Sequence, residues 1–68
     1  MPSSVIRGIE YDAQRQQLFI TFVSGKVYVY DRVPSEVHDA FLAHSSKGAF
    51  FNRFIRDRYR HCEVVQAS

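Results

Sequence analysis

The fold is decided by the stretch Leu18-Phe19-Ile20-Thr21-Phe22-Val23-Ser24-Gly25-Lys26-Val27-Tyr28-Val29-Tyr30. β-Branched and aromatic side chains fill it, and these suit a pleated, half-buried surface. Ser24-Gly25 interrupts the run where a chain reversal is needed, because glycine readily adopts a positive φ. The stretch therefore predicts two antiparallel strands joined by a tight turn.

The register of this hairpin decides whether its tyrosines are core or surface, because a slip of one residue flips every side chain. A two-residue loop would pair Phe22 with Val27 and place Tyr28 and Tyr30 on the sheet face away from Phe22. A three-residue loop with Gly25 in a bulge would pair Phe22 with Lys26. We favour the bulged turn, because Ser-Gly is a weak signal for the two-residue turn. The bulge also gathers large side chains on one face: Leu18, Ile20, Phe22, Tyr28 and Tyr30.

The segments on either side of the hairpin predict one more strand and two helices. Val5–Tyr11 alternates as a strand. Pro34 fits the first position of a helix, where its missing N–H would be unpaired anyway. Ser46 is a suitable N-cap for a second helix that begins near Lys47. Arg58 falls inside the apolar arc of this helix, so either the helix ends near Asp57 or the Arg58 side chain extends its charged end to water. The expected core comprises Ile9, Tyr11, Leu18, Ile20, Phe22, Val37, Phe41, Phe51 and Ile55.

These elements predict an α+β domain, a three-stranded antiparallel β-meander covered on one face by two α-helices. The domain is expected to span residues 1–68, with an ordered core from about residue 5 to residue 60. Glu63-Val64-Val65 is a further candidate for a short closing strand.

The composition describes one small domain without the usual marks of a secreted, membrane or zinc-binding protein. The chain has 68 residues, a net charge of +2 and a single cysteine, Cys62, which cannot form an internal disulfide. Its N-terminus lacks the apolar region of a signal peptide, and no run approaches transmembrane length. No Cys/His set has zinc spacing. We therefore expect a cytoplasmic location, no membrane partner, no metal and no cofactor.

Two motifs extend the pattern along most of the chain: Leu18-x-Ile20-x-Phe22-x-x-Gly25-x-x-Tyr28-x-Tyr30-x-x-Val33-Pro34, then Ser46-x-Gly48-x-x-Phe51-Asn52-x-x-Ile55-Arg56. Together they resemble the KTSC domain, a family named for its occurrence at the C-terminus of some lysyl-tRNA synthetases. The family also occurs as small stand-alone bacterial proteins and carries a central Tyr-x-Tyr, matched by Tyr28-Val29-Tyr30. His44 departs from the pattern, where a small residue is expected. The resemblance implies a cytoplasmic bacterial or phage domain for which RNA binding has been suggested.

Basic residues gather in the last third of the chain, where they could contact phosphates. At about 100° per residue, the second predicted helix places Arg53, Arg56 and Arg60 opposite its apolar arc. Lys47 lies near the start of that helix, and Arg32 is nearby if the fold allows. The alternative interpretation is a solvated helix face, because such patches are common on surface helices.

Tyr28 and Tyr30 could form a stacking platform for bases. Alternatively, both are core tyrosines whose hydroxyls reach a partner at the edge, which the bulged register favours. Asn52 and Arg56 are four residues apart and should share a helix face, as ligand contacts or as ties to a neighbouring loop. A pocket lined by these two residues with Tyr28 and Ser46 would reopen the question of an enzyme.

The sequence favours a small non-enzymatic interaction module that binds nucleic acid, with RNA preferred over other nucleic acids as the ligand. The arginines would supply phosphate contacts, exposed aromatic residues would supply stacking, and no catalytic residues are recognisable. The alternative is a protein–protein interaction or homodimerisation module, because an exposed apolar sheet face is a natural interface. That face would present Phe19, Val23, Val27 and Val29.

Overall fold

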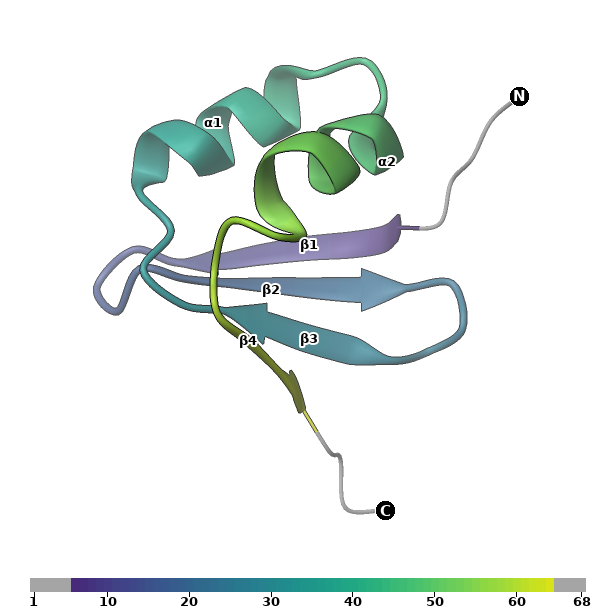
Figure 1. The fold of residues 1–68 in the computed structure, drawn as a ribbon, viewed down its shortest axis with the longest axis horizontal. Coiled ribbons are helices and arrows are strands. Elements are labelled where there is room, and N and C mark those ends of the chain that lie inside the picture. Colours follow the sequence, from purple (N-terminus) through teal and green to yellow (C-terminus); the bar gives the residue numbers. More distant parts are fainter. Residues whose placement is uncertain (1–5, 65–68) are drawn as a thin grey trace.

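The computed structural model describes residues 6–64, in which helices cover one face of a four-stranded antiparallel sheet (Figure 1). The strands lie side by side in the order in which they occur in the chain. The elements are β1 (Ile6–Asp12), β2 (Gln17–Phe22), β3 (Val27–Tyr30), α1 (Ser35–Ala43), α2 (Lys47–Phe50), η1 (Phe51–Ile55) and β4 (His61–Val64). The expected α+β class, with two helical segments on an antiparallel sheet, is confirmed.

The expectation of three strands is wrong, because β4 adds a fourth strand beside β3. Tyr30 lies opposite His61 in this pairing, and Val27 lies opposite Val64. Three of the four residues of β4 are exposed. The segment therefore lacks the alternation of buried and exposed residues that is typical of a half-buried strand. The candidate closing strand included Val65, which lies outside the described residues. β4 owes its strand conformation to its pairing with β3.

The bulged hairpin register is confirmed. The Phe22 N–H donates to the Lys26 carbonyl at 2.8 Å, and the Gly25 N–H donates to the Phe22 carbonyl at 2.8 Å. Gly25 has φ of +96°, in the region that favours glycine. Leu18 therefore lies opposite Tyr30, and the side chains of both strands that face the helices are the large apolar and aromatic ones.

The core lies between the sheet and the helical segments. Five of its eight buried residues were predicted, Leu18, Ile20, Phe41, Phe51 and Ile55. Four other predicted core residues are half-buried and pack against this cluster: Ile9, Tyr11, Phe22 and Val37. Three buried residues lie outside the expected core list: Tyr30, Val33 and Phe50. Burial of Tyr30 agrees with the core role that the bulged register favoured for the two tyrosines.

The second helix begins as predicted but is not one continuous α-helix. The Ser46 side chain accepts a hydrogen bond from the Ala49 N–H at 3.2 Å, as an N-cap does. The chain then widens into the π-helical turn η1, closed by a 2.8 Å bond from the Arg56 N–H to the Phe51 carbonyl. The regular helix therefore ends before Asp57, and the arginines that follow lie on a non-helical segment.

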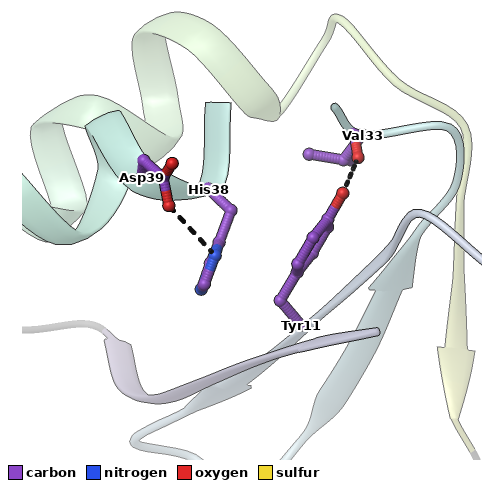
Figure 2. Close-up of polar contacts among 4 residues, drawn as sticks. All are labelled: Tyr11, Val33, His38 and Asp39. Atoms are coloured by element: carbon purple, nitrogen blue, oxygen red, sulfur yellow. Dashed lines mark hydrogen bonds and ion pairs between the residues drawn. The ribbon is translucent and has the colours of Figure 1, made fainter. Parts of the chain in front are cut away.

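Tyr11 ties the first strand to the start of α1 (Figure 2). Its hydroxyl donates to the Val33 carbonyl, and its ring stacks on the His38 ring with centroids 4.6 Å apart. His38 Nδ1 lies 3.9 Å from Asp39 Oδ1. Desolvation raises the pKa of Tyr11, and the carboxylate of Glu36 adds to the rise. The contact holds α1 over the β1 side of the sheet.

None of the helices within residues 6–64 is both long and apolar enough to cross a membrane.

Candidate functional site

A hollow of about 800 Å³ lies between the β2–β3 turn, the inner face of β3 and η1. Aromatic rings from both the sheet and the helical segment line it, so we call it the aromatic hollow. The rings belong to Phe22, Tyr28, Tyr30, Phe51 and His61, and the polar side chains beside them include Lys26, Asn52, Arg56 and Asp57.

The rings of the aromatic hollow pack edge to face on the sheet side. Phe22 and Tyr28 have centroids 5.5 Å apart with planes at 82°, and Tyr30 meets Phe51 at 5.6 Å and 81°. His61 lies against both tyrosines, at 5.7 Å from Tyr28 and 5.1 Å from Tyr30. This arrangement is the one aromatic quadrupoles prefer. Both rings of the Tyr-x-Tyr motif are thus packed against other aromatic rings.

The two tyrosines of the motif differ in accessibility. Tyr30 is only 3% exposed and belongs to the core, whereas Tyr28 is half-buried and lines the hollow. Tyr28 is thus the tyrosine of the motif that a ligand can reach. For Tyr30 the predicted core role is correct.

The polar groups of the hollow carry a net positive charge. The hollow has two cationic side chains, Lys26 from the β2–β3 turn and Arg56 from the end of η1, and one carboxylate, Asp57. Arg56 Nη1 donates to Asn52 Oδ1 at 3.4 Å, so the predicted Asn52–Arg56 pair does share one face. Desolvation raises the pKa of Tyr30 and nearby Tyr28 adds to the rise, while the positive charge of Arg56 opposes it. The hollow thus combines an aromatic surface with cations that suit an anion.

A second hollow, of about 630 Å³, lies at one end of the sheet. Arginines from three separate segments line it, so we call it the arginine hollow. Arg15 comes from the β1–β2 turn, Arg32 from the β3–α1 connection, and Arg58 and Arg60 from the segment before β4. Figure 1 shows these connections meeting at the end of the sheet away from the β2–β3 turn.

The structure divides the arginines that were expected to form one helical stripe. Arg56 lines the aromatic hollow, whereas Arg60 joins Arg32 in the arginine hollow. Arg53 is exposed and lines neither hollow. This difference from the expected stripe has a physical reason, since the helix ends before Arg60. Lys47 lines neither hollow and donates from Nζ to the carbonyls of Leu42 and His44, at 3.1 and 2.7 Å.

The pocket considered above as a possible enzyme site, with Tyr28, Ser46, Asn52 and Arg56 in its lining, is present in part. Tyr28, Asn52 and Arg56 line the aromatic hollow together, but Ser46 does not, because its hydroxyl caps α2. Among residues 6–64, no group of three His, Cys, Asp or Glu side chains could hold a metal ion.

Several residues of the two hollows were missed by sequence reasoning. His61 reaches the tyrosines only because β4 pairs with β3, and Arg15 and Arg58 meet only through the tertiary fold. Lys26 offered a usable signal, because the favoured register places it opposite Phe22, beside the aromatic face.

The expected apolar interface is only partly assembled. Phe19 lies opposite Val29, which lies opposite Cys62. Phe19 and Val29 alternate along their strands with the buried Leu18, Ile20 and Tyr30, so they belong to the other face of the sheet. Figure 1 shows that the helices cover one face alone. Phe19, Val27 and Val29 are all half-buried. Val23 is 60% exposed, but it lies in the β2–β3 turn and lines the aromatic hollow.

Comparison with known proteins places this chain among small domains of one kind. The sequence pattern of the KTSC domain matches residues 2–59. A protein of Tsukamurella paurometabola is 41% identical over 58 residues, covering 85% of this chain and 87% of its own length. A lysine–tRNA ligase of Nostoc punctiforme is 40% identical over 57 residues, which are 84% of this chain but 10% of the ligase. The crystal structure of a KTSC domain protein from Yersinia pestis has a TM-score of 0.89 and 32% identity, covering 96% of this chain and 92% of that one.

Proposed function

This chain belongs to the KTSC domain family, and on that premise we propose that it is an RNA-binding module that holds a single strand in the aromatic hollow. The observation that carries the proposal is the combination of an accessible aromatic ring with cations in one hollow. Tyr28 supplies the ring, and Lys26 and Arg56 supply the positive charges. Single-stranded RNA is bound through this combination, because bases stack on aromatic side chains while cations track the phosphates.

The roles of the residues follow from their chemistry and position. Tyr28 stacks on one unpaired base, and His61, at 5.7 Å, supports its ring. Arg56 contacts a phosphate through its guanidinium, whose geometry suits phosphate oxygens. Asn52 keeps amide hydrogens free to donate, since its contact with Arg56 uses the amide oxygen. These groups bind and orient a ligand, so we propose a binding role and no catalytic one.

A relative supports RNA as the ligand. In the lysine–tRNA ligase of Nostoc punctiforme the matching segment is part of a longer enzyme that acts on tRNA. In such a setting a small domain that binds single-stranded RNA would add contacts to the same substrate. For this chain we propose the same ligand class in a bacterial cytoplasm.

The test is an amide NMR titration with short single-stranded RNA, at low and at physiological salt. We expect saturable shifts at Lys26, Tyr28 and Arg56, weakening as salt rises because phosphate contacts release counterions. Duplex RNA of the same length should shift these signals less, since its bases are already stacked. If single-stranded RNA causes no shifts at low salt, the proposal is wrong.

Matched variants distinguish binding in the aromatic hollow from nonspecific attraction of RNA to the basic surface. Arg56→Gln should weaken binding several-fold and lower the salt slope by about one, whereas Arg53→Gln, which changes an exposed arginine outside both hollows, should not. Tyr28→Leu should also weaken binding, while Phe54→Leu, at another accessible aromatic residue, should leave it unchanged. Equal losses in both members of a pair would contradict the proposal.

The second candidate is a protein-interaction or homodimerisation module. The observation that favours it is the apolar row of Phe19 and Val29 on the uncovered sheet face, continued by Val27 in the next row. Size-exclusion chromatography distinguishes the two functions. A dimer that persists at high salt and is lost on Phe19→Lys would favour the interface.

A further inference from the structure

We propose that the arginine hollow is a binding site for a phosphate monoester, either the phosphorylated end of a nucleic acid strand or a free nucleotide. The inference does not depend on the aromatic hollow. It rests on the four arginines that line one cavity, Arg15, Arg32, Arg58 and Arg60.

The charge of this hollow is strongly unbalanced. Its lining has four arginines and one carboxylate, Asp31, which leaves a net charge of +3. Asp31 Oδ1 also accepts a hydrogen bond from Gln17 Nε2 at 3.2 Å. Within residues 6–64, no salt bridge involves any of these arginines. Like charges brought together repel one another, so an anion bound among them would be stabilised.

The backbone holds the arginines in place from two sides. The Asp31 N–H donates to the Arg60 carbonyl at 2.9 Å, which joins the β3–α1 connection to the segment before β4. The Val33 N–H donates to the Gln16 carbonyl at 2.8 Å, which joins the same connection to the β1–β2 turn. Arg32 lies between these two bonds with φ of +58°, a left-handed conformation that residues other than glycine adopt infrequently. The fold thus fixes the segment that carries Arg32.

The chemistry of the lining favours a phosphate monoester over other anions. A guanidinium donates two parallel hydrogen bonds to a phosphate, and several can share its oxygens. A monoester carries about −1.5 to −2 charges at neutral pH, which matches this hollow better than the single charge of a phosphodiester. Tyr59 also lines the hollow. The cavity of about 630 Å³ has room for the phosphate and part of the attached sugar.

The experiment is a set of NMR titrations monitored at the arginine side-chain Nε–Hε signals. The probes are inorganic phosphate, adenosine 5′-monophosphate, and one short RNA prepared with and without a 5′-phosphate. The phosphorylated RNA should bind about tenfold or more tightly than its unphosphorylated form, with shifts at Arg15 and Arg58, because charge-assisted bonds to a dianion are strong. If the mononucleotide binds as tightly as the phosphorylated RNA, the ligand is a free nucleotide; tighter binding of the RNA assigns the site to a strand end.

Variants test whether the hollow itself is responsible. The 5′-phosphate should raise the affinity of the RNA for the natural chain. Arg58→Gln and Arg32→Gly should each reduce this increase in affinity about fivefold or more, since each removes one guanidinium contact. Glycine suits the left-handed backbone at position 32, so the second variant should fold. Arg53→Gln is the control and should change nothing. Equal affinity with and without the 5′-phosphate, or an equal effect of Arg53→Gln, would overturn the proposal.

A further variant separates this inference from the proposed RNA site. Tyr28→Leu should abolish stacking in the aromatic hollow while leaving the shifts caused by inorganic phosphate at Arg58 unchanged. If RNA binding is lost while phosphate binding is intact, the arginine hollow is supported as an independent phosphate site. Loss of phosphate binding in Tyr28→Leu would show that the two hollows are not independent and would overturn the inference.

Discussion

The imidazole ring of His61 lies against the ring of Tyr30, with centroids 5.1 Å apart and planes inclined by 27°. The two residues are also opposite one another in the pairing of β3 with β4. One contact thus joins the fourth strand to the buried tyrosine of the Tyr-x-Tyr motif. The stack covers Tyr30 and completes one wall of the aromatic hollow.

Replacing His61 by alanine should therefore destabilise the domain. We expect the free energy of unfolding to fall by about 0.5–1.5 kcal/mol, the range measured for aromatic pairs. His61→Phe should retain most of this stability, because it keeps the stack. Urea denaturation measures the change, and Cys62→Ala, at the exposed neighbouring residue, is the control. An unchanged midpoint in His61→Ala would show that the ring contact contributes nothing.

Gly25→Ala should be costly for the hairpin. Apart from Gly25 itself and its two chain neighbours, no heavy atom lies within 4 Å of a Cβ added at Gly25, so the effect isolates the backbone strain at φ of +96°. Such strain costs about 1–3 kcal/mol at a non-glycine residue. Gly8→Ala is the matched control, because its added Cβ would meet Thr21 at an ordinary 3.9 Å. Thermal unfolding of both variants tests this, and a similar small loss in each would contradict the assigned turn.

Ser46→Ala should weaken the start of α2. The hydroxyl of Ser46 satisfies the Ala49 N–H, and loss of an N-cap costs about 1 kcal/mol. Ser45→Ala, at the exposed residue before it, should have little effect. Equilibrium denaturation followed by circular dichroism compares the two. Equal stability of both variants would mean that the cap is not needed.

Stability should fall at alkaline pH through Tyr30. Burial raises the pKa of Tyr30 above its ordinary value of 10.0, so the folded state holds the phenolic proton more tightly than the unfolded state. The resulting stabilisation is fully present below pH 10.0 and is lost as the pH rises through the folded-state pKa. The free energy of unfolding of the natural chain minus that of Tyr30→Phe should be constant below pH 10.0 and decrease as the pH rises above it. Denaturation across this range tests the sign, and a difference that increases with pH would contradict it.

The hairpin could be predicted because its determinants are local. Gly25 and the large side chains around it specify one register, and that register alone predicted Tyr30 as core. The N-cap at Ser46 is equally local. The π-helical turn could not be predicted, because α- and π-helical turns draw on the same residue types. Both ends of this turn, Phe51 and Ile55, are buried in the core.

The candidate site was predicted only in part, because its residues come from distant segments. Tyr28 and Arg56 were singled out, and they do line one hollow. His61 joins them through a strand whose exposed residues carry no apolar alternation. Arg60 was assigned to a helix face, yet it lies with Arg32 because the helix ends early. Contacts between segments distant in the sequence bring these residues together, so local sequence patterns could not predict them.

The fourth strand gives the domain a part that can open separately. β4 has four residues, three of them exposed, and it pairs with β3 alone. Short edge segments of this kind exchange their amide hydrogens through local openings that need less free energy than global unfolding. Because His61 belongs to the lining of the aromatic hollow, each opening removes part of its wall. A ligand in the hollow should therefore slow hydrogen exchange in β4, so the last strand would report occupancy of a site formed mainly by other elements.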